Sequence, residues 1–176
     1  MSVFDSIYLT GFRASGKTTL GLAISRQSGL VFLDTDHKLQ EEAGMSIESI
    51  VFSHGWDYFR DLEENILKQT VLSTGLVVAT GGGIVLRQSS RDILKNARFL
   101  TVYLKADPDL ILRRLNHDPN PGQRPSLSQA SMEDEVIENL TRREPLYQEC
   151  ADMVLDAGEP AGVLAVRVME KLSVSV

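Results

Sequence analysis

Short apolar runs alternate along this chain with longer stretches in which apolar residues recur every three or four positions. The near-continuous apolar runs are typical of strands that are covered on both faces. They predict strands at residues 7–10, 30–33, 76–80, 99–104 and 153–155. Strands that alternate with amphipathic helices predict an α/β protein with a mostly parallel sheet.

The amphipathic stretches predict the helices between these strands. The first carries Leu20, Ala23 and Ile24 at helical spacing and is expected to stop at Gly29. The others are expected to begin after Gly55, to cover about 107–115, to begin at 131 and to cover about 161–172.

The helix that begins at residue 131 has sequence signals at both ends. Ser131 and Asp134 match a capping box at its start. Pro145 is expected to end the helix, because proline lacks the N–H that a helix interior requires.

Composition narrows the class of protein. A chain of 176 residues with 43% hydrophobic and 24% charged residues fits one globular domain, 1–176. The net charge of −6 argues against a nucleic-acid partner held by a basic surface. An anionic small molecule is still compatible with this charge, provided that a few arginines converge locally.

The cysteine and the histidines do not indicate a disulfide or a metal site. Cys150 is the only cysteine, so an internal disulfide and a cysteine-rich metal site are excluded. The three histidines show no metal-ligand spacing. No secretory signal and no membrane span are expected from the apolar pattern, so a cytoplasmic location is expected.

Residues 11–18 read Gly-Phe-Arg-Ala-Ser-Gly-Lys-Thr and match the phosphate-binding pattern G-x-x-x-x-G-K-[ST]. Gly11 and Gly16 allow the tight curl that points backbone N–H groups at an anion. Lys17 is expected to reach the β- and γ-phosphates, and the Thr18 hydroxyl to ligate Mg²⁺. The alternative is a glycine-containing turn that matches by chance, but the flanking strand and helix favour the phosphate-binding loop.

Two carboxylates, Asp34 and Asp36, directly follow the second predicted strand. Ligands of parallel sheets bind at the carboxyl ends of the strands. One carboxylate is suited to hold Mg²⁺, directly or through water, and the other to accept a proton from an attacking hydroxyl. The alternative for either residue is a helix N-cap.

Three consecutive glycines, Gly81, Gly82 and Gly83, follow the third predicted strand. Their cost in backbone entropy favours a close approach to a ligand over a simple turn. Arg60 and Arg143 are each able to bind a carboxylate bidentately, although surface ion pairs are the commoner use of arginine.

A long segment between helices, about 116–131, is rich in proline, glycine and polar residues. Loops of this length are often lids or binding loops. Arg124 in its middle is a candidate to close over a transferring phosphoryl group, with a solvated surface arginine as the alternative.

These motifs together resemble the shikimate kinases, small members of the nucleoside-monophosphate-kinase-like group. The resemblance rests on the phosphate-binding loop, Asp-Thr-Asp at 34–36, Phe-Arg-x-x-Glu at 59–63, the three glycines, Arg-Pro-x-Leu at 124–127 and Arg-x-Pro-Leu-Tyr at 143–147. It implies a three-layer sandwich with a five-stranded parallel sheet in the order 2-3-1-4-5.

The resemblance also implies a reaction and roles for the matching residues. The γ-phosphoryl of ATP would pass to the 3-hydroxyl of shikimate, with Mg²⁺ as cofactor. Asp36 would bind shikimate and act as, or orient, the base, with Lys17 and Arg124 as the other catalytic residues. The residues implied to bind shikimate are Asp36, Arg60, Gly81, Gly82, Gly83 and Arg143.

The remaining implied contacts concern the nucleotide and the metal. Thr18 would ligate Mg²⁺ directly and Asp34 through water. ATP would contact Ala14, Ser15, Gly16, Lys17, Thr18, Thr19 and Arg124, with Arg113 or Arg114 near the adenine. A helical region of about 36–63 would bind shikimate, the segment 116–131 would form the lid, and a monomer is expected.

Two features depart from the family pattern. Ala14 stands where many relatives have glycine, which matters if that position needs a positive φ. Members of the family often place a polar or basic residue near the adenine in the loop after the last strand, and here that loop, at 156–160, reads Asp-Ala-Gly-Glu-Pro. Two other functions stay open: a kinase of another polyol acid or of a nucleotide, and a nucleotide-binding regulatory module without catalysis.

Overall fold

The computed structural model of the chain describes residues 4–96, 98–117 and 131–174, so most of the expected lid, with Arg124, lies outside the described residues. At its centre is a five-stranded sheet in the order β2-β3-β1-β4-β5, in which every neighbouring pair is parallel. The strands are β1 (Ser6–Thr10), β2 (Val31–Asp34), β3 (Leu76–Ala79), β4 (Phe99–Lys105) and β5 (Met153–Asp156). The predicted fold class and strand order are confirmed.

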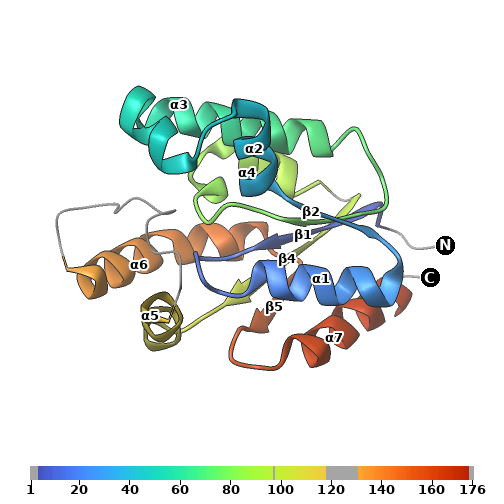
Figure 1. Cartoon of the computed structure of the whole chain (residues 1–176). Coiled ribbons are helices and arrows are strands. Elements are labelled where there is room, and N and C mark those ends of the chain that lie inside the picture. Colours follow the sequence, from blue (N-terminus) through green and yellow to red (C-terminus); the bar gives the residue numbers. More distant parts are fainter. Residues whose placement is uncertain (1–3, 97, 118–130, 175–176) are drawn as a thin grey trace.

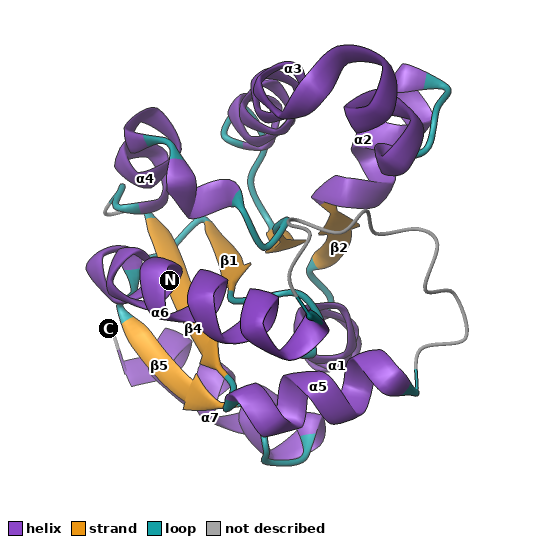
Figure 2. Ribbon diagram, turned by 90° about the vertical axis from the view of Figure 1, so that its left-hand side faces the viewer, coloured by secondary structure: helices purple, strands orange, loops and turns teal. Residues whose placement is uncertain are grey.

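Helices cover both faces of the sheet (Figures 1 and 2). Their bounds are α1 (Lys17–Ser28), α2 (Thr35–Ala43), α3 (Ile47–Thr70), α4 (Gln88–Leu94), α5 (Pro108–Asn116), α6 (Met132–Cys150) and α7 (Ala161–Val174), with a 3₁₀ turn η1 at Ile84–Leu86. The two faces have separate cores, one with α1 and α7, the other with α3, α4 and the C-terminal part of α6. The three layers of the predicted sandwich are therefore present.

The side chains of β1 show why the chain forms two cores. Ile7 and Leu9 point into the core beneath α1, and Tyr8 points into the core beneath α3. Successive side chains of a strand face opposite sides of the sheet, so a strand in the middle of three layers needs apolar residues throughout. The Tyr8 hydroxyl still finds a partner in Thr70 Oγ1, 2.9 Å away.

Gly55 interrupts α3 rather than preceding it. Its backbone has φ 83° and ψ 171°, so the element consists of two helical segments that meet at this residue. The prediction of a helix that begins after Gly55 is correct for the second segment. It misses the first segment, whose Ile50 is buried against Leu39 of α2.

The predicted end of α6 at Pro145 is wrong, because the helix continues to Cys150. A proline removes one hydrogen bond from a helix interior. The residues beyond it compensate, since Tyr147 and Cys150 are both buried in the core beneath α3. The predicted start of this helix is confirmed, because the Ser131 hydroxyl accepts a hydrogen bond from the Asp134 N–H at 3.2 Å.

The apolar pattern did not predict the short helices α2 and α4, although α2 lies within the helical region of about 36–63 that the resemblance implies. Both are brief, and neither carries enough apolar residues to show a clear helical period. Within the part of the chain that the structure describes, no helix is both long and apolar enough to span a bilayer.

Candidate active site

A cleft of about 1020 Å³ opens where the strands of the sheet end. Its walls come from the carboxyl ends of four strands: the loop after β1, Asp34 at the end of β2 with Asp36 behind it, Thr80 and Gly82 after β3, and residues 157–161 after β5. The carboxyl edge of a parallel sheet is the expected place for a ligand. The cleft thus brings the predicted phosphate-binding loop and the predicted carboxylates into one space.

The loop at residues 11–16 curls between β1 and α1, as its sequence predicts. Gly11 and Gly16 have φ values of 143° and 103°, which glycine adopts at little cost. A β-carbon on Gly11 would also lie 2.7 Å from the carbonyl oxygen of Leu104. Lys17 Nζ donates hydrogen bonds to the carbonyls of Gly11 and Phe12, at 2.9 and 2.8 Å, so the lysine closes the loop around its own backbone.

Ala14 adopts the left-handed conformation, with φ 60°. An L-residue with a β-carbon loses roughly 1–2 kcal/mol in this region, whereas glycine does not. The departure from the family pattern at this position therefore has a physical cost. Every other positive φ among the described residues belongs to a glycine.

Asp34 has the N-cap role that the sequence left open as the alternative. Its Oδ1 accepts hydrogen bonds from the N–H groups of Asp36 and His37, at 3.1 and 3.3 Å, so it is the N-cap of α2. Its Oδ2 accepts a hydrogen bond from the Thr18 hydroxyl at 2.9 Å. The cap fixes the carboxylate beside the start of α1.

The pair of Thr18 and Asp34 fits Mg²⁺, which prefers hard oxygen ligands and keeps several waters. In the described part of the chain, no group of three or more histidine, cysteine or acidic side chains is placed to hold a metal. A magnesium ion here would therefore take most of its other ligands from phosphates and water.

The three glycines after β3 are needed for close packing. None of them has a positive φ, so an unusual backbone conformation is not the reason for them. A β-carbon on Gly81 would collide with the carboxylates of Asp36 and Glu63, and one on Gly83 with the guanidinium of Arg60. One on Gly82 would lie 3.0 Å from the backbone nitrogen of Arg13. The turn thus brings the backbone against several of the site's charged groups.

Glu63, quoted above only as part of a motif, is a buried acid in this site. It forms an ion pair with Arg60, and its side chain is only 3% exposed. Burial raises the pKa of Glu63 to about 7, the positive charge of Arg60 opposes that shift, and the nearby Asp36 adds to it. Arg60 also lies over the rings of Trp56 and Phe59, so its orientation is well determined.

Arg143 is a buried cation with neutral partners. It is 4% exposed and donates to the carbonyl of Gly82 at 3.2 Å and to Asn139 Oδ1 at 3.1 Å. Among the described residues, no carboxylate forms an ion pair with it, and its guanidinium lies over the ring of Phe12. Burial, with a smaller contribution from Arg60, lowers the pKa of Arg143. Buried charges are normally paired, so this arrangement favours an anionic ligand.

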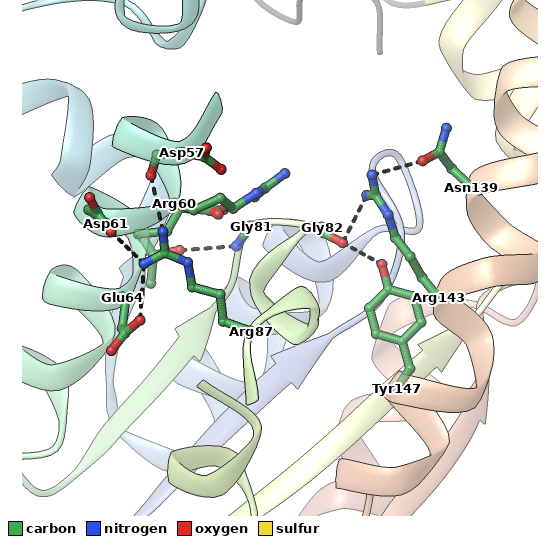
Figure 3. A network of polar contacts seen from close by, with 12 residues as sticks. Asp57, Arg60, Asp61, Glu64, Gly81, Gly82, Arg87, Asn139, Arg143 and Tyr147 are labelled. Carbon is green, nitrogen blue, oxygen red and sulfur yellow. Dashed lines mark hydrogen bonds and ion pairs between the residues drawn. The ribbon is translucent and has the colours of Figure 1, made fainter. Parts of the chain in front are cut away.

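Figure 3 shows the glycine turn between Arg60, which comes from α3, and Arg143, which comes from α6. Tyr147 lies one turn beyond Arg143, and its hydroxyl donates to the same Gly82 carbonyl. Neither arginine is a plain surface ion pair, because one is paired inside the site and the other has no described anionic partner. The predicted convergence of two arginines on one place is present.

The other end of the cleft contains Arg114 and not Arg113. Arg114 Nη1 donates to the carbonyls of Ser15 and Ala14, at 2.7 and 3.1 Å, and its Nη2 donates to Ala157 at 2.8 Å. The arginine therefore joins the phosphate-binding loop to the loop after β5. Arg113 is exposed and does not line the cleft.

Sequence reasoning missed several residues that organise the site. Arg13 of the loop pairs with the buried Glu135 of α6 at 2.5 Å. Arg87 pairs with Asp61 and Glu64, and so ties the segment after the glycine turn to α3 (Figure 3). On α6 the buried polar residues recur every fourth position, at Glu135, Asn139, Arg143 and Tyr147. That spacing was a readable signal of an inward-facing polar stripe.

Comparison with known proteins finds similarity to shikimate kinases. The family model described as shikimate kinase matches residues 13–173. Shikimate kinase 2 of Yersinia enterocolitica is 42% identical over 156 residues, which cover 89% of this chain and 88% of the relative. Shikimate kinase of Nitratidesulfovibrio vulgaris is 40% identical over 158 residues, 90% of either chain.

Solved structures agree with these relatives. Shikimate kinase from Acinetobacter baumannii, determined in complex with shikimate, superposes with a TM-score of 0.90 at 31% identity and covers 97% of this chain and 94% of its own. An APS kinase of Mycobacterium tuberculosis superposes with a TM-score of 0.59 at 16% identity over 97% of this chain and 98% of its own, a likeness of fold alone.

Proposed function

The chain belongs to the shikimate kinase family, and we propose that it transfers the γ-phosphoryl of Mg·ATP to the 3-hydroxyl of shikimate, giving 3-phosphoshikimate and ADP. One observation carries the choice of acceptor. Arg143 is a buried cation without a described anionic partner, and it lies on the glycine turn that borders Asp36. An acceptor that carries both a carboxylate and a hydroxyl matches these two groups.

On the donor side, the phosphate-binding loop and Lys17 hold the phosphates of ATP. Backbone N–H groups of the loop and the N-terminal end of α1 supply partial positive charge. Lys17 exchanges its hydrogen bonds to the loop carbonyls for the β- and γ-phosphates. Arg114 borders the part of the cleft that would take the rest of the nucleotide, together with the loop after β5.

On the acceptor side, Asp36 is the group that takes or orients the proton of the attacking hydroxyl. It stands in the first turn of α2 and lines the same cleft as Lys17. Arg60 and Arg143 bind the shikimate carboxylate, and Gly82 presents its backbone to the substrate. Phosphoryl transfer then depends mainly on positioning and on neutralisation of charge.

Mg²⁺ would be held by the Thr18 hydroxyl directly and by Asp34 through water, and it would neutralise charge on the β- and γ-phosphates. The role expected for Arg124 at the transferring phosphoryl, and a lid at 116–131, stay predictions. So do a monomeric state, a cytoplasmic location and the absence of nucleic-acid and membrane partners.

The test of the proposed function is ADP release by the purified chain with Mg·ATP, with and without shikimate. We expect release that depends on shikimate and a product that is 3-phosphoshikimate. A panel with gluconate and CMP separates the alternative kinases, and preferential phosphorylation of either would overturn the proposal. Binding of both Mg·ATP and shikimate without turnover would instead support the non-catalytic regulatory module.

A further inference from the structure

Asn139 has an unusual position for a neutral side chain, because it lies between the buried Arg143 and the exposed Arg142. Its Oδ1 accepts a hydrogen bond from Arg143 at 3.1 Å and another from Arg142 at 2.9 Å. The residue is 7% exposed and comes one helical turn before Arg143 on α6. A carboxylate at this place would be the more usual partner of two guanidinium groups.

The orientation of the Asn139 amide is determined by its surroundings. Its Nδ2 donates to the carbonyl of Glu135 at 2.9 Å, one turn earlier on the same helix. With the amide reversed, its oxygen would face that carbonyl and its NH₂ would face the arginine donors, so both contacts would be lost. The oxygen is therefore directed at Arg143 by the backbone of α6.

The charge of Arg143 is not consumed by these contacts. The oxygens beside its guanidinium, Asn139 Oδ1, the Gly82 carbonyl and the Tyr147 hydroxyl, are all neutral. The Arg60 side chain on the opposite side of the glycine turn differs, since it is paired with Glu63. The one arginine is thus held in place by an acid and the other by an amide.

We propose that Asn139 is a positioning residue that determines specificity: it orients Arg143 while leaving the positive charge of that arginine available to the carboxylate of the acceptor. The proposal rests on the proposed function and deepens it. A neutral hydrogen-bond acceptor at residue 139 does not compete with the substrate carboxylate for the charge of Arg143. An aspartate of nearly the same shape would pair with Arg143 and occupy it.

The test is the isosteric substitution Asn139→Asp, assayed with shikimate and with its neutral carboxamide analogue. We expect the KM for shikimate to rise about 10-fold or more, the KM for ATP to stay within about twofold, and kcat to change less than the shikimate KM. The preference for shikimate over the carboxamide, measured as a ratio of kcat/KM values, should fall by about the same factor. A structural defect alone would lower kcat/KM equally for shikimate and for the carboxamide, and it would leave that ratio unchanged.

Two further variants make the test decisive. Asn65→Asp adds the same charge at an exposed position of α3, and it should leave the ratio at its wild-type value. Asn139→Ala removes the hydrogen-bond partner of Arg143 without adding a charge. It should raise the shikimate KM about threefold or more and keep most of the preference for shikimate over the carboxamide. If the aspartate variant fails to fold, the alanine variant carries the test, and an unchanged shikimate KM in it would overturn the proposal.

An unchanged ratio in Asn139→Asp, with a wild-type shikimate KM, would equally overturn it. Failure of the proposed function looks different, because the wild-type chain would then show no ADP release that depends on shikimate. The wild-type chain could turn over shikimate while Asn139→Asp keeps the wild-type preference for shikimate over the carboxamide. That result would refute only the role of Asn139.

Discussion

The donor and acceptor halves of the candidate site are built in opposite ways. The phosphate-binding part of the donor half is one continuous stretch, residues 11–18, which leads from β1 into α1 and relies on backbone groups and one lysine. The acceptor half takes Asp36 from α2, Arg60 from α3, Gly82 from the turn after β3 and Arg143 from α6. The first half is a local property of the chain, and the second exists only when four elements meet.

The electrostatics of the two halves differ as well. In the donor half the lysine is surrounded by carbonyl oxygens, and the loop can form before any ligand arrives. In the acceptor half buried ionic groups lie close together, with Glu63 tied to Arg60 and Arg143 held by neutral oxygens. We therefore expect substitutions in the acceptor half to act on shikimate and on pH dependence, and to leave nucleotide binding nearly intact.

The largest expected effect is that of Asp36→Asn. The amide keeps the shape of the side chain but cannot take the proton of the attacking hydroxyl, so kcat should fall by about 10²–10⁴-fold. Binding of ATP, measured by titration calorimetry, should change little because the phosphate-binding loop is untouched. Near-normal turnover would refute Asp36 as the catalytic carboxylate.

Arg143→Ala should weaken the binding of shikimate and leave the binding of ATP nearly unchanged. Loss of charge-assisted hydrogen bonds to a carboxylate is expected to raise the shikimate KM about 100-fold, with little change in the ATP KM. Arg143→Lys, which keeps the charge but loses the bidentate geometry, should lie between the alanine variant and the wild type. Equal rises in both KM values would contradict the separation of the two halves.

Glu63 should make the stability of the acceptor half depend on pH. Its folded-state pKa of about 7 lies above the usual 4.5, so the folded chain retains a proton across that window that the unfolded chain has lost. The free energy of unfolding should therefore fall as pH rises from about 5 to 8, by roughly 2 kcal/mol from this group. In Glu63→Gln, urea unfolding at several pH values should show a shallower fall.

The neighbouring acid provides a matched control for that measurement. A hydrogen bond from Lys68 lowers the pKa of Glu64 to about 2, so Glu64 is ionised throughout the same window. Glu64→Gln should leave the slope between pH 5 and 8 as it is in the wild type. An identical slope in Glu63→Gln and the wild type would show that Glu63 does not titrate there.

The smallest effect is expected in the donor half, at Ala14. Glycine at this position removes the steric cost of φ 60° but adds backbone entropy to the unfolded chain, so Ala14→Gly should raise the free energy of unfolding by roughly 0.5 kcal/mol. Ala23→Gly, in the ordinary helical backbone of α1, should lower it by about 1 kcal/mol. A loss of stability in Ala14→Gly would show that the position carries no strain.

The elements that the sequence predicted correctly are those with a strong local signal. The central strands β1, β3 and β4 are buried along almost their whole length because both faces of the sheet are covered there, and Gly29 and Ser131 are the observed limits of their helices. The elements missed or misjudged lack such a signal. α2 and α4 are too short to show a helical period, so only the resemblance implied a helical region that includes α2. α6 continues past Pro145 because the tertiary packing of Tyr147 and Cys150 outweighs the lost hydrogen bond.

The sequence by itself determined the phosphate-binding loop, because its two glycines allow the curl of the backbone and Lys17 binds the carbonyls of Gly11 and Phe12 a few residues away. It also placed Asp34 and Asp36 at a strand end, where the topology of a parallel sheet brings ligands. Only the tertiary structure decided the partners of the buried charges: that Glu63 holds Arg60, that Asn139 holds Arg143, and that Gly82 lies between the two arginines. Those contacts join residues that are distant along the chain, and the desolvation that makes them matter arises only when the elements pack together.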